Sequence, residues 1–370
     1  MAGRAAMSRA QILFVTFAAM AIIEGSGRRA AVRGAGRADL NQEERGGETP
    51  SAPSIQAHRS AAFGGLASWC SGRLPSSCGA PKHKQRAVAV HLAGLRERLL
   101  LNGTLQNVVG PIARKGFAVH IYMTLLDQGK GKPFDGAKWS AKQDPNLAWR
   151  DHENLAQYLF DQVEQAGGCL VCLRLFDHAE ALPNISEGAP WDERLTQYLP
   201  RTTETGRNVL RLWKSREDMW SISLGHEKQM NQKYAFAMWT RDDTHWMRPI
   251  STQWLDDMEK SAKRVWSKDC MSQMGINDKT VLFGRTAAAV MLTAYSSFFR
   301  PGSQYNSHNA EVYLKRLGHS AHLELGTLDF DSLPGVDGVR RGERGKEYIC
   351  VVDSYWCGGE DVSAWGQTFC

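Results

Sequence analysis

From Arg86 onward the sequence alternates between short apolar runs and longer segments with helical spacing, and this alternation restricts the fold more than any other feature. The apolar runs predict buried strands at 87–92, 117–125, 169–176, 234–240, 281–283, 322–328 and 348–352. The segments between them predict helices at 95–115, 151–166, 206–232, 286–299 and 309–317. Strands that alternate with helices indicate an α/β protein with a mostly parallel sheet flanked by helices on both faces.

The chain before Arg86 has a different composition. Residues 28–85 are rich in Gly, Ala, Ser, Arg and Pro, with few large apolar side chains and no periodicity. Such a segment buries too little surface to offset its conformational entropy. The sequence therefore predicts three parts: a targeting segment at 1–27, a disordered basic stem or linker at 28–85, and a folded domain at 86–370.

The net charge of +6 lies entirely in the N-terminal part of the chain, and this distribution argues against nucleic acid as a partner of the folded part. Residues 1–85 hold 11 Lys/Arg against 5 Asp/Glu, whereas residues 86–370 hold 34 of each sign. The folded part is therefore neutral overall and lacks the net basic charge that nucleic-acid binding leaves in a composition.

The first 27 residues resemble a secretory targeting segment. Ile12 to Ile23 is an apolar run interrupted only by Thr16, and Arg4 and Arg9 precede it. The run is short for a membrane span, which needs ~20 apolar residues. It is read as a cleaved signal peptide or a short signal anchor, with an organelle transit peptide as the alternative. We expect a secretory-pathway protein held in the Golgi membrane by this segment as a single pass, or else a secreted or organellar protein.

Two glycosylation sequons and eight cysteines agree with a lumenal location. The sequons begin at Asn102 and Asn184. Cys70 and Cys78, and Cys350 and Cys357, are close enough in sequence to close small loops, although the connectivity stays open. Cys169 and Cys172 invite a zinc or redox interpretation. They lie in a predicted strand, where positions i and i+3 face opposite ways, so buried thiols are favoured.

In open α/β sheets, ligands bind beyond the carboxyl ends of the strands, and the polar cluster with the clearest chemistry follows the strand at 234–240. Asp242, Asp243 and His245 supply oxygen and nitrogen ligands that suit Mg²⁺ or Mn²⁺ bound to a diphosphate. If the backbone stays extended, Asp243 and His245 face the same way. The alternative is structural: the two acids cap the next segment and pair with Arg241 or Arg248.

Two further clusters precede a strand and a helix. Asp278 is a candidate general base for an acceptor hydroxyl, and Lys279 a candidate diphosphate ligand, although Asn277-Asp278 also favours a simple turn. Glu311 is a candidate for acceptor binding or an alternative base. It also suits the first turn of a helix capped by Ser307 or Asn309.

The segment Ala93 to Arg98 follows the first strand, where the first βα turn of a nucleotide-binding sheet meets its ligand. Gly94 and Arg96 are candidates there. The segment lacks Gly-x-Gly-x-x-Gly, so a dinucleotide fold is not supported. The chain also lacks Gly-x-Ser-x-Gly and His-Glu-x-x-His, which lowers esterase and metalloprotease interpretations.

Four short motifs recur here in a fixed order: Val88 to Arg96, Thr240 to Asp243, Asn277 to Lys279 with Phe283-Gly284, and Asn309 to Glu311. In this order they resemble a group of glycosyltransferase-like proteins, found mainly in algae and fungi, that is similar to bacterial polysaccharide-type glycosyltransferases. The resemblance spans roughly 86–353. It implies a GT-A (Rossmann-like) fold in which an acidic strand end binds a divalent metal and the nucleotide sugar. One difference is that Asp242-Asp243-Thr244 stands where the usual metal motif is Asp-x-Asp.

The expected function is transfer of a sugar from a nucleotide-diphosphate donor to a glycan or glycoprotein acceptor. The expected donor-binding residues are Gly94, Arg96, Arg241, Asp242 and Lys279. The expected ligands for Mn²⁺ or Mg²⁺ are Asp242, Asp243 and His245. The expected base is Asp278 or Glu311. The alternative is a non-catalytic lumenal protein that binds glycans through exposed aromatic side chains such as Trp239, Trp246 and Trp254. A sulfotransferase is disfavoured, because the first strand is followed by only one Gly.

Overall fold

The computed structural model describes residues 69–70, 86–96, 99–127, 155–177, 203–270, 272, 274–300, 309–337, 339–340 and 350–351, all within one compact unit, Ala57–Cys370. The predicted targeting segment, Asn184, Ser307 and three cysteines (Cys78, Cys357, Cys370) lie outside these ranges. Within them, no helix combines the length and the apolar character that crossing a membrane requires.

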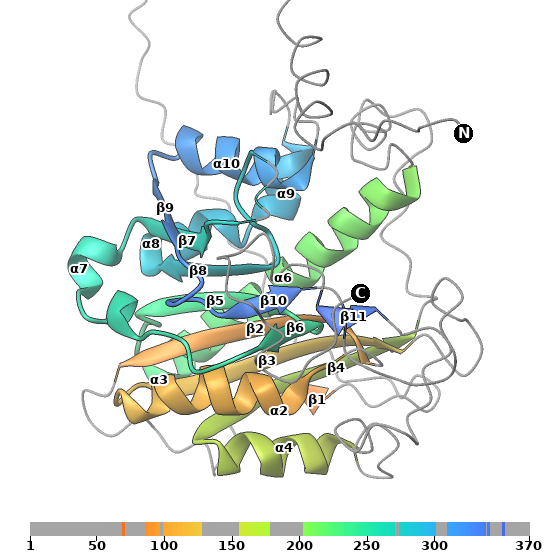
Figure 1. Cartoon of the computed structure of the whole chain (residues 1–370), viewed down its shortest axis with the longest axis vertical. Coiled ribbons are helices and arrows are strands. Elements are labelled where there is room, and N and C mark those ends of the chain that lie inside the picture. Colours follow the sequence, from red (N-terminus) through yellow and green to blue (C-terminus); the bar gives the residue numbers. More distant parts are fainter. Residues whose placement is uncertain are drawn as a thin grey trace, which may run out of the picture. The chain divides into compact units, whose positions relative to one another are not determined.

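The centre of the fold is an eight-stranded mixed sheet with the order β1-β4-β3-β2-β5-β8-β7-β9 (Figure 1). Its parallel half consists of β2 (Ala87–Leu95), β3 (Ala118–Asp127), β4 (Gly168–Asp177) and β5 (Phe236–Arg241). Numbered by their appearance in this half, these strands have the order 3-2-1-4, which is compatible with a Rossmann-like arrangement. The order reverses direction between β2 and β5.

Beyond β5 the sheet becomes mixed. β8 (Thr280–Gly284) pairs antiparallel with β5 and with β7 (Arg264–Lys268), and β9 (Glu324–Leu328) pairs parallel with β7. The sequence did not predict β7, because Arg-Val-Trp-Ser-Lys is too short and polar to stand out. Small two-stranded pairs are made by β6 (Thr244–Trp246) with β10 (Gly335–Asp337), and by β11 (Val339–Arg340) with β12 (Cys350–Val351).

Helices cover both faces of the sheet, as the sequence predicted (Figure 1). One face packs against α6 (Thr203–Met230), α8 (Arg285–Met291), α9 (Ala294–Phe299) and α10 (Ala310–Ser320). The other packs against α2 (Leu101–Thr104), the π-helical turn η3 (Leu105–Val109), α3 (Gly110–Arg114) and α4 (Leu155–Gln165). A 3-10 turn η5 (Gln253–Leu255) and α7 (Met258–Ser261) precede β7. Side chains of β2 alternate between the two cores: Ala87 and Ala89 face α6, and Val88 and Val90 face α3.

Helix boundaries differ from the predicted ones in two places. The predicted helix at 95–115 begins only at Leu101, because β2 continues through Leu95. The predicted helix at 286–299 is divided into α8 and α9. At the division, the Thr293 hydroxyl donates to the carbonyls of Ala289 and Val290. A side chain that competes in this way for main-chain acceptors disfavours a continuous helix.

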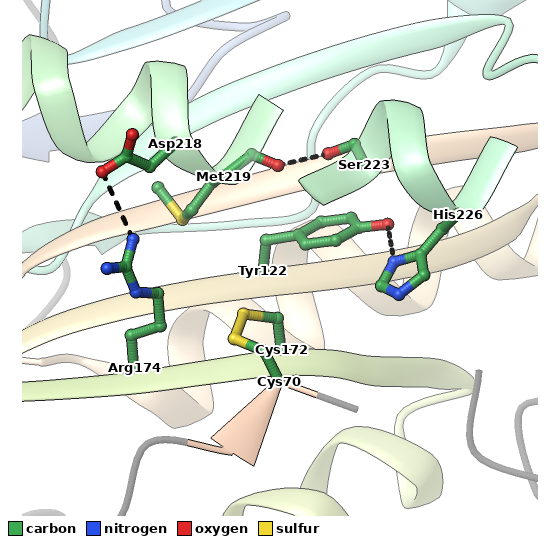
Figure 2. Close-up of a disulfide and its surroundings, with 8 residues drawn as sticks. All are labelled: Cys70, Tyr122, Cys172, Arg174, Asp218, Met219, Ser223 and His226. Atoms are coloured by element: carbon green, nitrogen blue, oxygen red, sulfur yellow. Dashed lines mark hydrogen bonds and ion pairs between the residues drawn. A yellow bond between two sulfur atoms is a disulfide. The ribbon is translucent and has the colours of Figure 1, made fainter. Parts of the chain in front are cut away.

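Helix α6 is attached to the sheet by buried polar side chains as well as by apolar packing. The His91 Nε2 atom lies 2.8 Å from the Ser223 hydroxyl. The Tyr122 hydroxyl lies 3.0 Å from His226 Nδ1 (Figure 2). Tyr122 also contacts the hydroxyl of Tyr234 at 2.7 Å. Burial, with a smaller contribution from the charge of Arg216, lowers the pKa of His91 to about 3, so this side chain is neutral in the folded protein.

A disulfide joins Cys70 to Cys172 and attaches the edge strand β1 (Trp69–Cys70) to its neighbour β4 (Figure 2). Three expectations change. The loop between Cys70 and Cys78 does not form; Cys169 and Cys172 are both disulfide-bonded rather than free thiols; and β1, although within the predicted linker 28–85, belongs to the sheet.

Cys169 and Cys172 also face the same core rather than opposite faces. A register shift opposite Ile121 and Tyr122 leaves Val171 as an extra residue in β4. A bulge of this kind reverses the alternation of side chains beyond it. The predicted opposite orientation is therefore wrong.

Candidate functional site

The four polar clusters identified in the sequence meet at one edge of the sheet. The carboxyl ends of β2 and β5 lie at this edge, and the strand order reverses between these two strands. β8 runs antiparallel to β5, so its first residue, Thr280, pairs with Thr240, the next-to-last residue of β5. Their hydroxyl oxygens are 3.2 Å apart. The loop that holds Asp278 therefore adjoins the Asp242-Asp243 turn, at the position where α/β sheets bind ligands.

Asp242 connects the ends of β2 and β5. It is 1% exposed, and its Oδ2 atom accepts a hydrogen bond of 2.8 Å from the main-chain N–H of Leu95. A Cβ atom on Gly94 would lie 1.9 Å from Asp242 Oδ1, so only glycine allows this close approach. The predicted cluster at Gly94 and the predicted cluster at Asp242 are thus in direct contact.

Asp243 forms a two-point ion pair with Arg241. The Arg241 Nε and Nη2 atoms donate to the two carboxylate oxygens at 2.9 Å and 2.7 Å. This is the structural alternative that the sequence left open, with Arg241 rather than Arg248 as the partner. The backbone turns at 242–243 between β5 and β6, so the condition that it stay extended, on which Asp243 and His245 were expected to face the same way, is not met.

The expected metal ligands do not fit a divalent ion in this arrangement. Both oxygens of Asp243 are bonded to Arg241, and Asp242 is bonded to the backbone of β2. His245 lies beyond the turn, on β6, opposite Val336 of β10. Within the part of the chain that the structure describes, no group of three or more His, Cys, Asp or Glu side chains is placed to hold a metal ion.

The loop before β8 shows the turn chemistry that the sequence allowed. The Asn277 side chain donates to the carbonyl of Cys270 at 2.9 Å and accepts from the main-chain N–H of Lys279 at 3.1 Å. Asn277 is fully buried, while Asp278 and Lys279 are only partly buried. The turn therefore presents Asp278 and Lys279 at the same edge as the end of β5.

Glu311 lies beside this loop, in the first turn of α10. Of the two predicted caps, Asn309 is the N-cap residue. Its side chain accepts a hydrogen bond from the main-chain N–H of Val312 at 2.8 Å. The carbonyl of Glu311 accepts from the N–H of Ile276 at 3.0 Å, which holds α10 against the loop. Burial, and secondly the charge of Asp278, raise the pKa of Glu311 to about 7. The two carboxyl groups therefore form an interacting pair, one of which titrates near neutral pH.

Arg216 is a further residue at this edge that the sequence analysis missed. It lies in the middle of α6, is 1% exposed, and donates from Nη2 to the carbonyl of Asp278 at 2.8 Å. Its guanidinium stacks on Trp239, with Cζ 3.8 Å from the ring centroid. A signal was present: Trp213, Arg216 and Trp220 share one helical face, which places an arginine within an apolar stripe.

The remaining predicted residues lie as follows. Arg96 is partly buried and directly follows β2. Asn102 lies in α2 rather than in a loop, and the hydroxyl of Thr104, the third residue of its sequon, is buried and donates to the carbonyl of Leu100. Trp239, Trp246 and Trp254 are 0%, 2% and 6% exposed, so the expectation that they form an exposed glycan-binding surface is wrong.

Comparisons with known proteins give little help. No protein-family model matches the sequence, and no curated protein matches it. One similar solved structure, described as PaToxG Glycosyltransferase, covers 66% of this chain and 74% of its own, with 7% sequence identity and a TM-score of 0.24. A similarity this distant determines neither fold nor activity.

Proposed function

We propose that this chain is a glycosyltransferase of GT-A type that transfers a sugar from a nucleotide-diphosphate donor to a glycan or glycoprotein acceptor. The observation that carries the proposal is the Asp278–Glu311 pair at the edge where β2 and β5 end. Within the pair it is Glu311 whose pKa near 7 suits general acid–base work at neutral pH, and the charge of Asp278 contributes to that value. The cationic side chains of Arg216, Arg241 and Lys279 lie at the same edge and suit a diphosphate.

In the proposed reaction the acceptor hydroxyl oxygen forms a bond to the anomeric carbon of the sugar. The bond from that carbon to the diphosphate oxygen breaks, and the nucleotide diphosphate leaves with the electron pair. Asp278 accepts the proton of the acceptor hydroxyl, with Glu311 as the alternative base. Gly94, Arg96, Arg241, Asp242 and Lys279 form the proposed donor site.

The proposal also includes a lumenal location in the secretory pathway. The Cys70–Cys172 disulfide supports it, since such bonds persist in oxidising compartments and are rare in the cytosol.

The test is donor turnover by the full chain. The protein is incubated with a panel of nucleotide-diphosphate sugars, with and without Mn²⁺, and release of the free nucleotide diphosphate is measured. With the donor that is used, Asp278→Asn should lower the rate by about 10²–10⁴-fold, the range that a positioned general base contributes.

The matched control is Asp256→Asn. Asp256 pairs with Lys115 at the surface, and Lys115 immediately follows α3 and precedes β3, at the opposite edge of the sheet. This variant should keep the wild-type rate. The proposal fails if no donor is turned over, or if Asp278→Asn and Glu311→Gln both turn over donor as fast as the wild type.

A further inference from the structure

Two nitrogens of the Arg216 side chain have no hydrogen-bond partner among the residues that the structure describes. The side chain is buried, and its Nε and Nη1 atoms have no hydrogen-bond partner. Only Nη2 is bonded, to the carbonyl of Asp278 at 2.8 Å. Buried donors without acceptors are costly and rare in folded proteins. These nitrogens therefore indicate an acceptor that the described part of the chain does not provide.

The guanidinium is held in a fixed orientation. It stacks on Trp239, and Trp239 itself packs edge-on against Phe283 at a centroid distance of 4.8 Å. Trp239 and Arg241 are two residues apart on β5 and so face the same side of the sheet. The stack therefore directs Arg216 to the side of the sheet on which Arg241 lies.

The charges around Arg216 favour an anion. Burial is the main cause that lowers the pKa of Arg216 to about 9, Asp278 opposes this effect, and the positive charge of Arg241 adds to it. The guanidinium is still protonated at neutral pH. Two arginines are thus close enough to repel each other, and Asp243 already pairs with Arg241. A negatively charged ligand would relieve this repulsion.

We infer that Arg216, together with Arg241, binds a phosphate group and supplies the charge neutralisation that the sequence had assigned to a metal at Asp242 and Asp243. The unpartnered Nε and Nη1 atoms would donate to non-bridging phosphate oxygens. That this phosphate belongs to a nucleotide diphosphate rests on the proposed function; the anion site itself does not.

Inorganic pyrophosphate is the probe that separates the two claims. Its binding to the full chain is measured by isothermal titration calorimetry in buffer containing EDTA. The wild type should bind it, and more weakly at high ionic strength, because the interaction is between charges. Arg216→Gln should weaken binding at least tenfold, and Arg216→Lys should weaken it less, since a point charge keeps attraction but loses the planar donor geometry.

Arg285→Gln is the matched control. Arg285 also stacks on a tryptophan, Trp220 of α6, with Cζ 4.9 Å from the ring centroid, but its charge is already paired with Glu227 at 2.8 Å. It follows the carboxyl end of β8, which is the opposite edge of the sheet from Thr280. This variant should bind pyrophosphate within twofold of the wild type.

Folding of each variant is checked by circular dichroism and thermal melting. If Arg216→Gln does not fold, the wild-type protein is labelled with ¹⁵N-arginine and studied by NMR. The Nε–H resonance of Arg216 is assigned as the one that is missing in Arg216→Lys. This resonance should shift on addition of pyrophosphate. The inference is overturned if the wild type does not bind pyrophosphate in EDTA, if folded Arg216→Gln binds equally well, or if that resonance does not shift. Pyrophosphate binding without donor turnover would keep this site and reject the proposed function.

Discussion

At the scale of single residues, the account depends on how Asp278 and Glu311 influence each other. Burial is the larger cause of the raised pKa of Glu311, and the charge of Asp278 is the second. Asp278→Asn should therefore lower the pKa of Glu311 from about 7 while leaving it above its ordinary value. A ¹³C NMR titration of the labelled glutamate carboxyl groups measures this, with Asp256→Asn as the control that should leave Glu311 unchanged. An identical Glu311 titration in Asp278→Asn would show that the carboxyl groups do not interact.

Gly94 and Gly225 give a second pair of predictions at this scale. Alanine at Gly94 would place Cβ 1.9 Å from Asp242 Oδ1, so Gly94→Ala should displace Asp242 and reduce donor turnover and stability together. Gly225 lies within α6 and an added Cβ meets nothing within 4 Å. Gly225→Ala should stabilise the protein by about 0.4–1 kcal/mol. Chemical denaturation measures both, and a Gly94→Ala variant as stable and active as the wild type would contradict the contact.

The candidate residues could be found from the sequence because strand ends are recognisable, but their partners could not. Asp242 and Asp243 follow an apolar run, which marks them as polar residues at a strand end. Asp242 bonds to Leu95 because β2 and β5 are neighbours, and Asp243 bonds to Arg241 because the backbone turns at 242–243. The local sequence pattern predicts neither the strand pairing nor the turn. Arg216 was missed because an arginine in a helix is usually solvated.

At the scale of elements, the interface between α6 and β2 should make stability depend on pH. The pKa of His91 is about 3 in the folded protein and about 6.5 in the unfolded chain. The unfolded chain therefore binds a proton that the folded protein does not in the window between these values, and stability contributed by His91 is lost as the pH falls through it. The loss at pH 5 is about 2 kcal/mol.

The check compares the wild type with His91→Gln, so that other titrating groups cancel. The difference between their free energies of unfolding should favour the wild type most at pH 7.5 and decrease by about 2 kcal/mol at pH 5. A difference that is independent of pH would mean that His91 is not held neutral by burial.

The Cys70–Cys172 disulfide attaches β1 to the sheet across a sequence separation of 102 residues. A cross-link over so long a loop restricts the unfolded chain, and its removal typically costs about 2–5 kcal/mol. The double variant Cys70→Ala/Cys172→Ala should therefore unfold at lower denaturant concentration than the wild type. An unchanged midpoint would show that this cross-link does not contribute to stability.

At the scale of the whole molecule, the sequence predicted the α/β class and helices on both faces, because the periods of 2 and 3.6 residues are local. It did not predict the antiparallel pairing of β8, or β7 and β6, which are short and polar. It also placed β1 within a linker, because the two residues Trp69–Cys70 join the sheet through contacts with the distant strand β4. Contacts between distant segments are what local patterns do not encode.

The central claim is that the edge where β2 and β5 end binds a nucleotide diphosphate. The most direct measurement is the melting temperature of the full chain with each of a panel of nucleotide diphosphates, in buffer containing EDTA. A ligand at about 100 times its Kd stabilises the folded protein by about 2.7 kcal/mol. The account predicts a rise of several degrees with at least one nucleotide, absent in Arg216→Gln but present in Arg285→Gln. A melting temperature that no nucleotide raises would contradict it.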